Sequence, residues 1–129
     1  MAESRRKGAC GERELASRIT ELFGVPARRG QQFRGGSDSP DVVHGLAGLH
    51  LECKRTEKLR LWEALDQAAS DAGARVPAVC HRPNRRDWVV IVKLADLPRM
   101  ARLIEENRRA VRSTIAPDMR TEKPSEAAR

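Results

Sequence analysis

The sequence predicts an α/β protein of one domain, in which a central mixed β-sheet is flanked by α-helices. Three observations support this prediction. The length of 129 residues suits one domain, segments with helical periodicity alternate with short β-branched runs, and no segment is repeated along the chain. We place the folded domain at residues 1–112 and expect a disordered tail at residues 113–129, which hold too few apolar side chains to pack.

The first predicted element is an amphipathic helix over residues 8–23. Its apolar side chains recur at the spacing that places them on one helix face, and Gly24 ends the helix. A short extended piece and a loop rich in glycine and polar residues follow over residues 24–40. The apolar face of the helix consists of Leu15, Ala16, Ile19, Leu22 and Phe23.

Two short strands, at residues 41–43 and 49–53, are predicted to form a β-hairpin with "HGLAG" as its turn. Charged groups lie at the inner ends of both strands, namely Asp41, Glu52 and Lys54. An isolated buried charge is unfavourable, so these groups indicate either an ion-pair network or a binding site.

The second half of the chain predicts a helix over residues 59–72, ended by Gly73, and then the strands "VPAVCH" and "DWVVIV" around an arginine-rich turn. A final helix over residues 94–111 carries a proline in its first turn, where proline is tolerated. The buried stripe expected on the helix at 59–72 is Leu61, Leu65, Ala68 and Ala72, and that on the final helix is Leu97, Met100, Ala101, Ile104 and Val111.

Composition narrows the possible partners and location. Lysine and arginine total 25 against 18 acidic residues, a net charge of +7. This balance favours a phosphate-rich partner, although like charge also serves solubility alone. No apolar run is long enough to span a membrane, and the charged residues 1–14 lack the apolar core of a signal peptide, so a cytoplasmic protein without membrane contact is expected.

The cysteines are three in number and widely spaced. This arrangement matches neither a disulfide framework nor a zinc pattern, and the histidines at 44, 50 and 81 do not complete one. We therefore expect reduced core residues at Cys10, Cys53 and Cys80.

Side-chain alternation on the strand at 49–53 places Glu52 and Lys54 on one face, with Asp41 across the predicted hairpin. Two nearby carboxylates repel unless a proton or cation lies between them, and hard oxygen ligands suit Mg²⁺. At 100° per residue, Glu12 lies within the apolar face of the first helix. It either belongs with the other acids or interacts favourably with the helix N-terminus.

These residues carry a resemblance to a known family. "Pro40-Asp41", ten residues, then "Glu52-Cys53-Lys54" resembles the PD-(D/E)xK nuclease motif, and "KGACGEREL" from Lys7 to Leu15 is similar to the first-helix signature of archaeal-type Holliday junction resolvases. The two motifs occur in the order found in those resolvases, and Ser37 stands four residues before the aspartate, as it does there. The likeness spans residues 7–67 and implies a restriction-endonuclease-like fold.

The resemblance implies a site around Mg²⁺, with Mn²⁺ expected to substitute. It assigns Glu12, Asp41 and Glu52 as acidic ligands, with the backbone carbonyl of Cys53 as a further ligand. Lys54 takes the role of the motif's lysine, for which a structural salt bridge is the alternative. Two further positions match the family pattern, Ser37 in a loop needed for cleavage and Gln67 on the following helix, where an exposed structural glutamine is the alternative.

Several cations precede the first helix or lie on loops and element ends near the motif, where they can follow phosphate backbones. Each is also compatible with an ordinary solvated surface charge. Few aromatic residues are present for base stacking, which favours recognition of duplex DNA over single strands. The candidate DNA-binding residues are Arg5, Arg6, Lys7, Arg28, Arg29, Arg34, Arg55, Lys58, Arg82, Arg85 and Arg86.

The function implied is a Mg²⁺-dependent, structure-selective endonuclease that resolves four-way DNA junctions by paired phosphodiester hydrolysis as a homodimer. One alternative is the same catalytic fold used as a nickase or restriction-like endonuclease on other DNA. A second alternative, from a different class, is a non-catalytic nucleic-acid-binding module.

Overall fold

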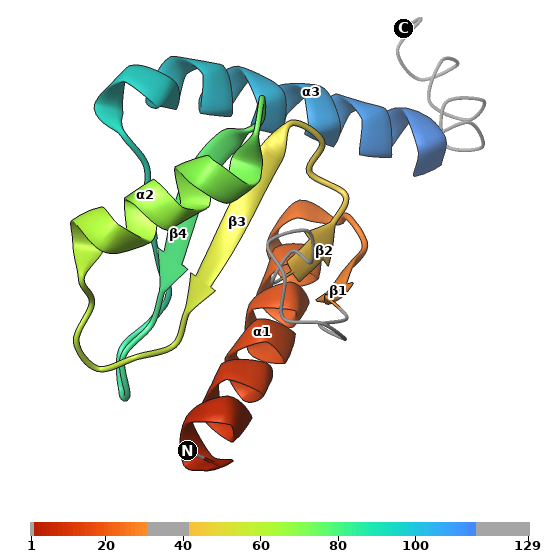
Figure 1. Cartoon of the computed structure of the whole chain (residues 1–129). Coiled ribbons are helices and arrows are strands. Elements are labelled where there is room, and N and C mark those ends of the chain that lie inside the picture. The colour runs from red at the N-terminus through yellow and green to blue at the C-terminus, as the bar shows by residue number, and fades with distance from the viewer. Residues whose placement is uncertain (1, 31–41, 116–129) are drawn as a thin grey trace, which may run out of the picture.

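A computed structural model of the chain describes residues 2–30 and 42–115, with the side chains of residues 10–30 and 42–113 (Figure 1). Helices and short strands alternate along it, as predicted. The elements are α1 (Ala2–Phe23), β1 (Ala27–Arg29), β2 (Val42–His44), β3 (Leu49–Lys54), α2 (Leu61–Ala72), β4 (Val76–His81), β5 (Val89–Ile91), the 3₁₀ turn η1 (Leu94–Asp96) and α3 (Leu97–Ile115).

The main sheet has the strand order β3-β4-β5 and is mixed, which confirms that prediction. Strands β3 and β4 are parallel over their whole length, from Leu49 opposite Val76 to Lys54 opposite His81, while β4 and β5 are antiparallel. Parallel neighbours need a long crossover, which α2 supplies. The ends of β3 and β4 that carry Lys54 and His81 therefore lie at the same edge of the sheet.

The predicted hairpin between residues 41–43 and 49–53 is wrong. Strand β2 pairs antiparallel with β1 in a separate two-stranded sheet, and β3 instead takes β4 as its neighbour. The turn itself ties β3 to β4, because the amide of Val76 donates to the carbonyl of Gly48 at 2.8 Å. A three-residue β2 carries too little pattern to identify its partner strand.

Helices cover both faces of the main sheet (Figure 1). On one face, α1 and α3 bury a core with β3 and β4. On the other face, α2 packs its small side chains on Val79 and Ile91. The first core includes Leu15, Ala16, Ile19, Leu49, Leu51, Val76, Ala78, Cys80 and Met100, and the second includes Ala64, Leu65 and Ala68.

Several buried positions differ from those predicted. On α2, Ala64 is buried in place of Leu61, which is 38% exposed, and on α3 both Leu97 and Ala101 are exposed. The helix boundaries also differ, since α1 starts at Ala2 and α3 extends to Ile115. Residues 116–129 of the predicted tail lie outside the described residues.

The expectation of three core cysteines is correct only for Cys80, which is buried, while Cys53 is half-buried and Cys10 is exposed. Position 10 lies about 140° around α1 from Leu15, at 100° per residue, and so leaves the apolar face. Burial raises the pKa of the Cys80 thiol to about 12, which keeps it protonated and unreactive.

None of the helices in the described part of the chain combines the length and the apolar character that a membrane crossing requires.

Candidate functional site

A row of polar side chains runs along β3 on the face toward α2. His50 and Glu52 are each only 3% exposed, and His50 Nε2 lies 3.2 Å from Glu52 Oε1. The other carboxylate oxygen, Oε2, lies 3.9 Å from Lys54 Nζ. We call His50, Glu52 and Lys54 the β3 row. Their shared direction follows from the period of two in a strand, as predicted for Glu52 and Lys54.

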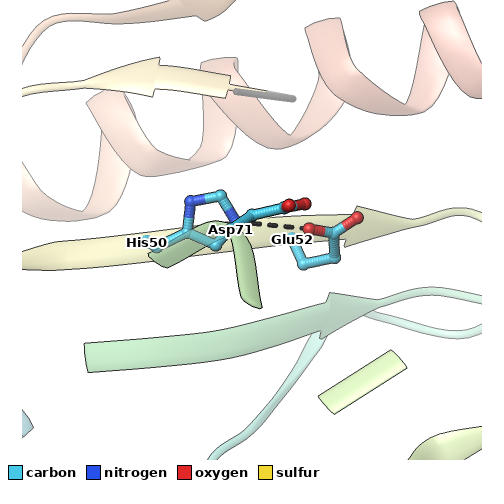
Figure 2. Close-up of side chains that lie close together, drawn as sticks. All are labelled: His50, Glu52 and Asp71. Atoms are coloured by element: carbon cyan, nitrogen blue, oxygen red, sulfur yellow. Dashed lines mark hydrogen bonds and ion pairs between the residues drawn. The ribbon is translucent and has the colours of Figure 1, made fainter. Parts of the chain in front are cut away.

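Helix α2 adds two side chains to this row. Lys54 Nζ donates to Gln67 Oε1 at 3.2 Å, so the structure brings the predicted Gln67 next to the predicted lysine. Asp71 is four residues further along the same helix face, and its carboxylate lies with His50 and Glu52 in a cluster whose ligand atoms are all within 4.8 Å of one another. Figure 2 shows these three side chains converging between β3 and α2.

A small pocket opens beside the exposed end of the row. Its volume is about 200 Å³, and Lys54 and Gln67 form one part of its wall. Lys58 and Arg60, from the loop between β3 and α2, add two more cations, and Glu63 adds one acid. Three cations around a cavity of this size suit a phosphate group. The remaining lining residues are Thr56, Leu59 and Ala64.

Glu12 reaches the sheet from α1, which covers the face opposite α2. Its side chain is mostly buried, with 12% exposure, and its Oε1 accepts a hydrogen bond of 2.7 Å from Arg29 Nε of β1. The inward direction predicted for Glu12 is therefore confirmed. Arg29, which was predicted to contact DNA, thus forms a charge-assisted hydrogen bond with Glu12 in the structure.

Three predicted site residues, Ser37, Asp41 and Arg34, lie outside the described residues. The same holds for the side chains of Arg5, Arg6 and Lys7, whose backbone forms the first turns of α1. Cys53 lies between Glu52 and Lys54 on β3 and is aligned with Cys80 of β4.

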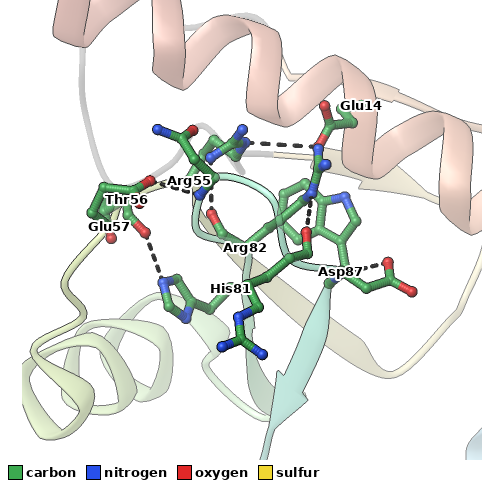
Figure 3. A network of polar contacts seen from close by, with 10 residues as sticks. Glu14, Arg55, Thr56, Glu57, His81, Arg82 and Asp87 are labelled. Atoms are coloured by element: carbon green, nitrogen blue, oxygen red, sulfur yellow. Dashed lines mark hydrogen bonds and ion pairs between the residues drawn. The ribbon is translucent and has the colours of Figure 1, made fainter.

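Two predicted DNA-binding cations, Arg55 and Arg82, form an ion-pair network with Glu14 (Figure 3). Glu14 of α1 pairs with Arg82 Nη1 at 2.5 Å and with Arg55 Nε at 3.8 Å. Arg55 Nη1 also donates to the Arg82 carbonyl at 3.1 Å, and its side chain is only 14% exposed. We call Glu14, Arg55 and Arg82 the loop network, because it joins α1 to the loops after β3 and after β4.

Backbone contacts complete the loop network. His81 Nε2 lies 2.8 Å from the Thr56 carbonyl, and the Asn84 amide donates to Glu57 Oε2 at 2.6 Å. At Gly11, an added Cβ would lie 2.5 Å from Arg55 Cβ, so a glycine is required for α1 to approach this loop. The two loops and α1 are thus held together beside the site.

The other predicted DNA-binding cations are exposed on the described surface: Arg28, Lys58, Arg85 and Arg86. Arg85 has a φ of 63°, in the left-handed region, within the tight turn between β4 and β5. These four side chains remain available to a phosphate backbone.

The sequence analysis missed His50 and Asp71 as members of the site. A signal for each was present, because His50 shares the strand face of Glu52 and Asp71 shares the helix face of Gln67. Only the packing of α2 on β3 brings the two faces together. Glu14 was missed as well, since nothing local connects it with Arg82, 68 residues away in sequence.

The arrangement combines a buried carboxylate, an adjacent lysine and an amide, at the wall of a basic pocket. Chemically, it can hold a cation at the carboxylate and an anion beside the lysine, which are the two halves of a metal-assisted phosphoryl reaction. Comparison of the chain with protein-family models, with curated proteins and with solved structures found no match.

Proposed function

We propose that the chain is a Mg²⁺-dependent DNA endonuclease with a restriction-endonuclease-like fold, of the PD-(D/E)xK superfamily, that cleaves four-way junctions as archaeal-type Holliday junction resolvases do. One observation carries the proposal. Lys54 Nζ lies between Glu52 Oε2, at 3.9 Å, and Gln67 Oε1, at 3.2 Å, on the wall of the basic pocket. A strand carboxylate and the lysine two residues later belong to the motif, and a glutamine on the following helix is often found with them in the resembling family.

The residues fit a hard divalent cation. Glu52 is a carboxylate buried between β3 and α2, and buried charges of this kind are normally paired or bound to metal. In the proposal, Glu52, Asp41 and Glu12 hold Mg²⁺ with the Cys53 carbonyl, and Mn²⁺ can replace it. When bound, the ion would polarise the phosphate and acidify a water molecule.

The chain's own groups position the reactants. Lys54 is partly exposed, at 28%, and its ammonium can stabilise charge on a phosphoryl oxygen or orient a water molecule. Gln67 restricts the lysine through its amide oxygen, which leaves the Nζ hydrogens with a defined direction. We propose Ser37 as a further contact to the phosphate.

Duplex DNA would contact the pocket side of the molecule. Lys58 and Arg60 line the pocket together with Lys54. The scissile phosphate would lie at Lys54, and the next phosphate of the same strand would enter the pocket. The exposed Arg85 and Arg86 on the next loop would extend the contact along a second backbone.

A homodimer is the proposed assembly. Strand β5 is the edge of the main sheet, and Val89 and Val90 on it are 51% and 52% exposed. Leu94 and Leu97 follow at 82% and 46% exposure. An exposed apolar edge strand of this kind favours pairing with a second copy, and a two-fold axis would give paired cuts.

The test is cleavage of matched four-way, forked, nicked and linear duplexes in Mg²⁺, with wild type, Lys54→Ala and Lys93→Ala. Lys93 is an exposed lysine away from the pocket and serves as the matched control. We expect the four-way substrate to be cut in pairs, Lys54→Ala to lose at least about 100-fold in rate and Lys93→Ala to match wild type.

The same assay separates the alternatives. Single nicks on all four substrates would replace the resolvase by a nickase, and cleavage of the linear duplex alone would indicate a restriction-like enzyme. Tight binding of junctions with no cleavage in Mg²⁺ or Mn²⁺ would leave a nucleic-acid-binding module and overturn the proposed activity.

A further inference from the structure

The cluster of His50, Glu52 and Asp71 brings one imidazole and two carboxylates together. All three ligand atoms lie within 4.8 Å of one another, and His50 and Glu52 are each 3% exposed. Two of the residues come from β3 and one comes from α2, so the cluster depends on the packing of the helix on the sheet (Figure 2). Buried polar groups gathered in this way require either mutual pairing or a bound cation.

The distances suit a small tetrahedral ion. Bonds of about 2.0–2.1 Å place two ligands of a tetrahedron about 3.3–3.4 Å apart. His50 Nε2 and Glu52 Oε1 are already 3.2 Å apart. The Asp71 carboxylate can complete the third position by rotation of its side chain, because Asp71 is only partly buried.

Glu52 can serve this cluster without leaving Lys54. Its Oε1 faces His50 and its Oε2 lies 3.9 Å from Lys54 Nζ. The two oxygens thus point toward two different neighbours, one inside the sheet–helix layer and one at the basic pocket.

A separate opening reaches the inner end of the cluster. A pocket of about 160 Å³ is lined by His50 together with His44 and Arg75, near the turn before β3. Water or a hydrated ion can approach His50 from this side, which provides the entry path that a metal site needs.

We infer that His50, Glu52 and Asp71 bind a divalent transition-metal ion, for which Zn²⁺ is the probe, with water as the fourth ligand. The imidazole decides the class of metal. Mg²⁺ prefers oxygen ligands and retains its waters, whereas imidazole suits Zn²⁺ and related ions. Three protein ligands with one open position are typical of zinc sites that retain a water molecule. This inner site is distinct from the proposed Mg²⁺ position and shares only Glu52 with it.

The binding experiment uses the full chain without DNA. Zn²⁺ is titrated by calorimetry into protein freed of metal, in a Cys10→Ser background that removes the exposed thiol. We expect one Zn²⁺ per chain and at least about tenfold weaker Zn²⁺ binding for Asp71→Asn and for His50→Gln. Asp71→Asn should leave the heat of a Mg²⁺ titration unchanged, because the proposed Mg²⁺ position does not include Asp71. His81→Gln is the matched control, since His81 lies outside the cluster, and should bind Zn²⁺ as the background does.

Asp71→Asn is the decisive variant. Asp71 is partly exposed, so its substitution should not disturb the core, whereas substitution of the buried His50 can do so. Equal Zn²⁺ affinity for Asp71→Asn, His81→Gln and the Cys10→Ser background would overturn the inference. X-ray absorption of the Zn²⁺ complex should show one imidazole nitrogen among oxygen ligands. Two or more imidazoles, or sulfur, would place the ion elsewhere. Neither readout depends on cleavage, so a failed nuclease assay leaves this result unchanged.

Discussion

The β3 row and the loop network are both charged, and both lie against β3, yet they are built differently. In the loop network, the Glu14 carboxylate pairs with two guanidinium groups, and each guanidinium also donates to a backbone carbonyl, that of Arg82 or of Arg86. In the β3 row and its helix neighbour Asp71, two carboxylates and an imidazole lie close together, and one of the carboxylates, Glu52, also lies beside Lys54. The first arrangement has more positive than negative groups and leaves no place for an added cation, and the second is suited to one.

This difference gives a physical criterion for telling a candidate ligand site from a structural ion-pair network. Positive groups outnumber the acid in the loop network, and the network ties three segments together. Acidic groups outnumber the lysine in the other cluster, where two members are nearly inaccessible and the lysine opens onto a pocket. A buried carboxylate next to a second, partly buried one is unfavourable without a ligand, and such pairs are often found at binding sites.

The largest expected effect is on the cleavage rate, when the carboxylate of the β3 row is removed and that of the loop network serves as the comparison. If the proposed function is correct, Glu52→Gln should lower the cleavage rate by at least about 1,000-fold, about 4 kcal/mol in activation free energy. Glu14→Gln should remain within about threefold of wild type. Single-turnover rates with excess enzyme on the four-way junction measure both. Comparable losses in the two variants would show that the loop network belongs to the catalytic machinery and would remove the distinction.

Much of the fold was predictable because its signals are local. The six-residue strand at Val76–His81 follows from its β-branched run, and Leu65, Ala68 and Ala72 of the α2 stripe follow from the helical period. Lys54 and Glu52 were placed on one face correctly for the same reason. The partners of β2 and β3 were not predictable, since β1 and β2 have only three residues each and strand pairing depends on long-range packing.

The membership of the candidate site was only partly predictable. Gln67 was named from the family resemblance alone, and the structure places it 3.2 Å from Lys54, while its role in the site stays a prediction. Asp71 required knowledge of how α2 lies on β3. Arg55 and Arg82 were assigned to DNA because a sequence shows an arginine's charge but not its distant partner, here Glu14.

Acid should destabilise the β3 row side of the molecule through His44. Burial, followed by the nearby His50 and Arg75, lowers the pKa of His44 from 6.5 to about 4, and its Nδ1 accepts from the Leu46 amide at 3.1 Å. A folded-state pKa below the unfolded one gives stability that is present above pH 6.5 and is lost as the pH falls toward 4. With a discount for partial exposure, the loss is about 2 kcal/mol.

Urea unfolding in EDTA between pH 7 and pH 4.5 measures this loss. His44→Asn keeps an acceptor in the place of Nδ1 but removes the titration, so its stability should depend less on pH than that of wild type. An identical pH dependence in the two proteins would assign the acid sensitivity to other groups.

Gly11→Ala tests the close approach that supports the loop network. The new Cβ would lie 2.5 Å from Arg55 Cβ and 2.9 Å from Arg55 Cγ, so α1 or the loop must shift. Overpacking of this kind costs about 1–3 kcal/mol, and alanine returns up to about 1 kcal/mol of helix propensity. We expect a net loss of about 1–2 kcal/mol in thermal unfolding. Ser17→Ala, at an exposed position of the same helix, should not be destabilised.

The smallest expected effect is the stability change of Glu14→Gln, and it is the one that decides whether the loop network is structural. The ion pair of Glu14 and Arg55 is neither fully buried nor fully exposed, since Arg55 is 14% and Glu14 is 38% exposed. Its loss should therefore lower the free energy of unfolding by about 1 kcal/mol, between the values for exposed and for buried ion pairs. Arg18 and Glu21 form an exposed pair on the same helix, and Glu21→Gln should cost clearly less. Glu52→Gln, by contrast, relieves a buried charge and should leave the free energy of unfolding equal or higher in metal-free buffer. Chemical denaturation of the three variants measures this order. If Glu52→Gln were the most destabilised, the buried carboxylate would be a structural element of the sheet, and the cation site would need another ligand at its centre.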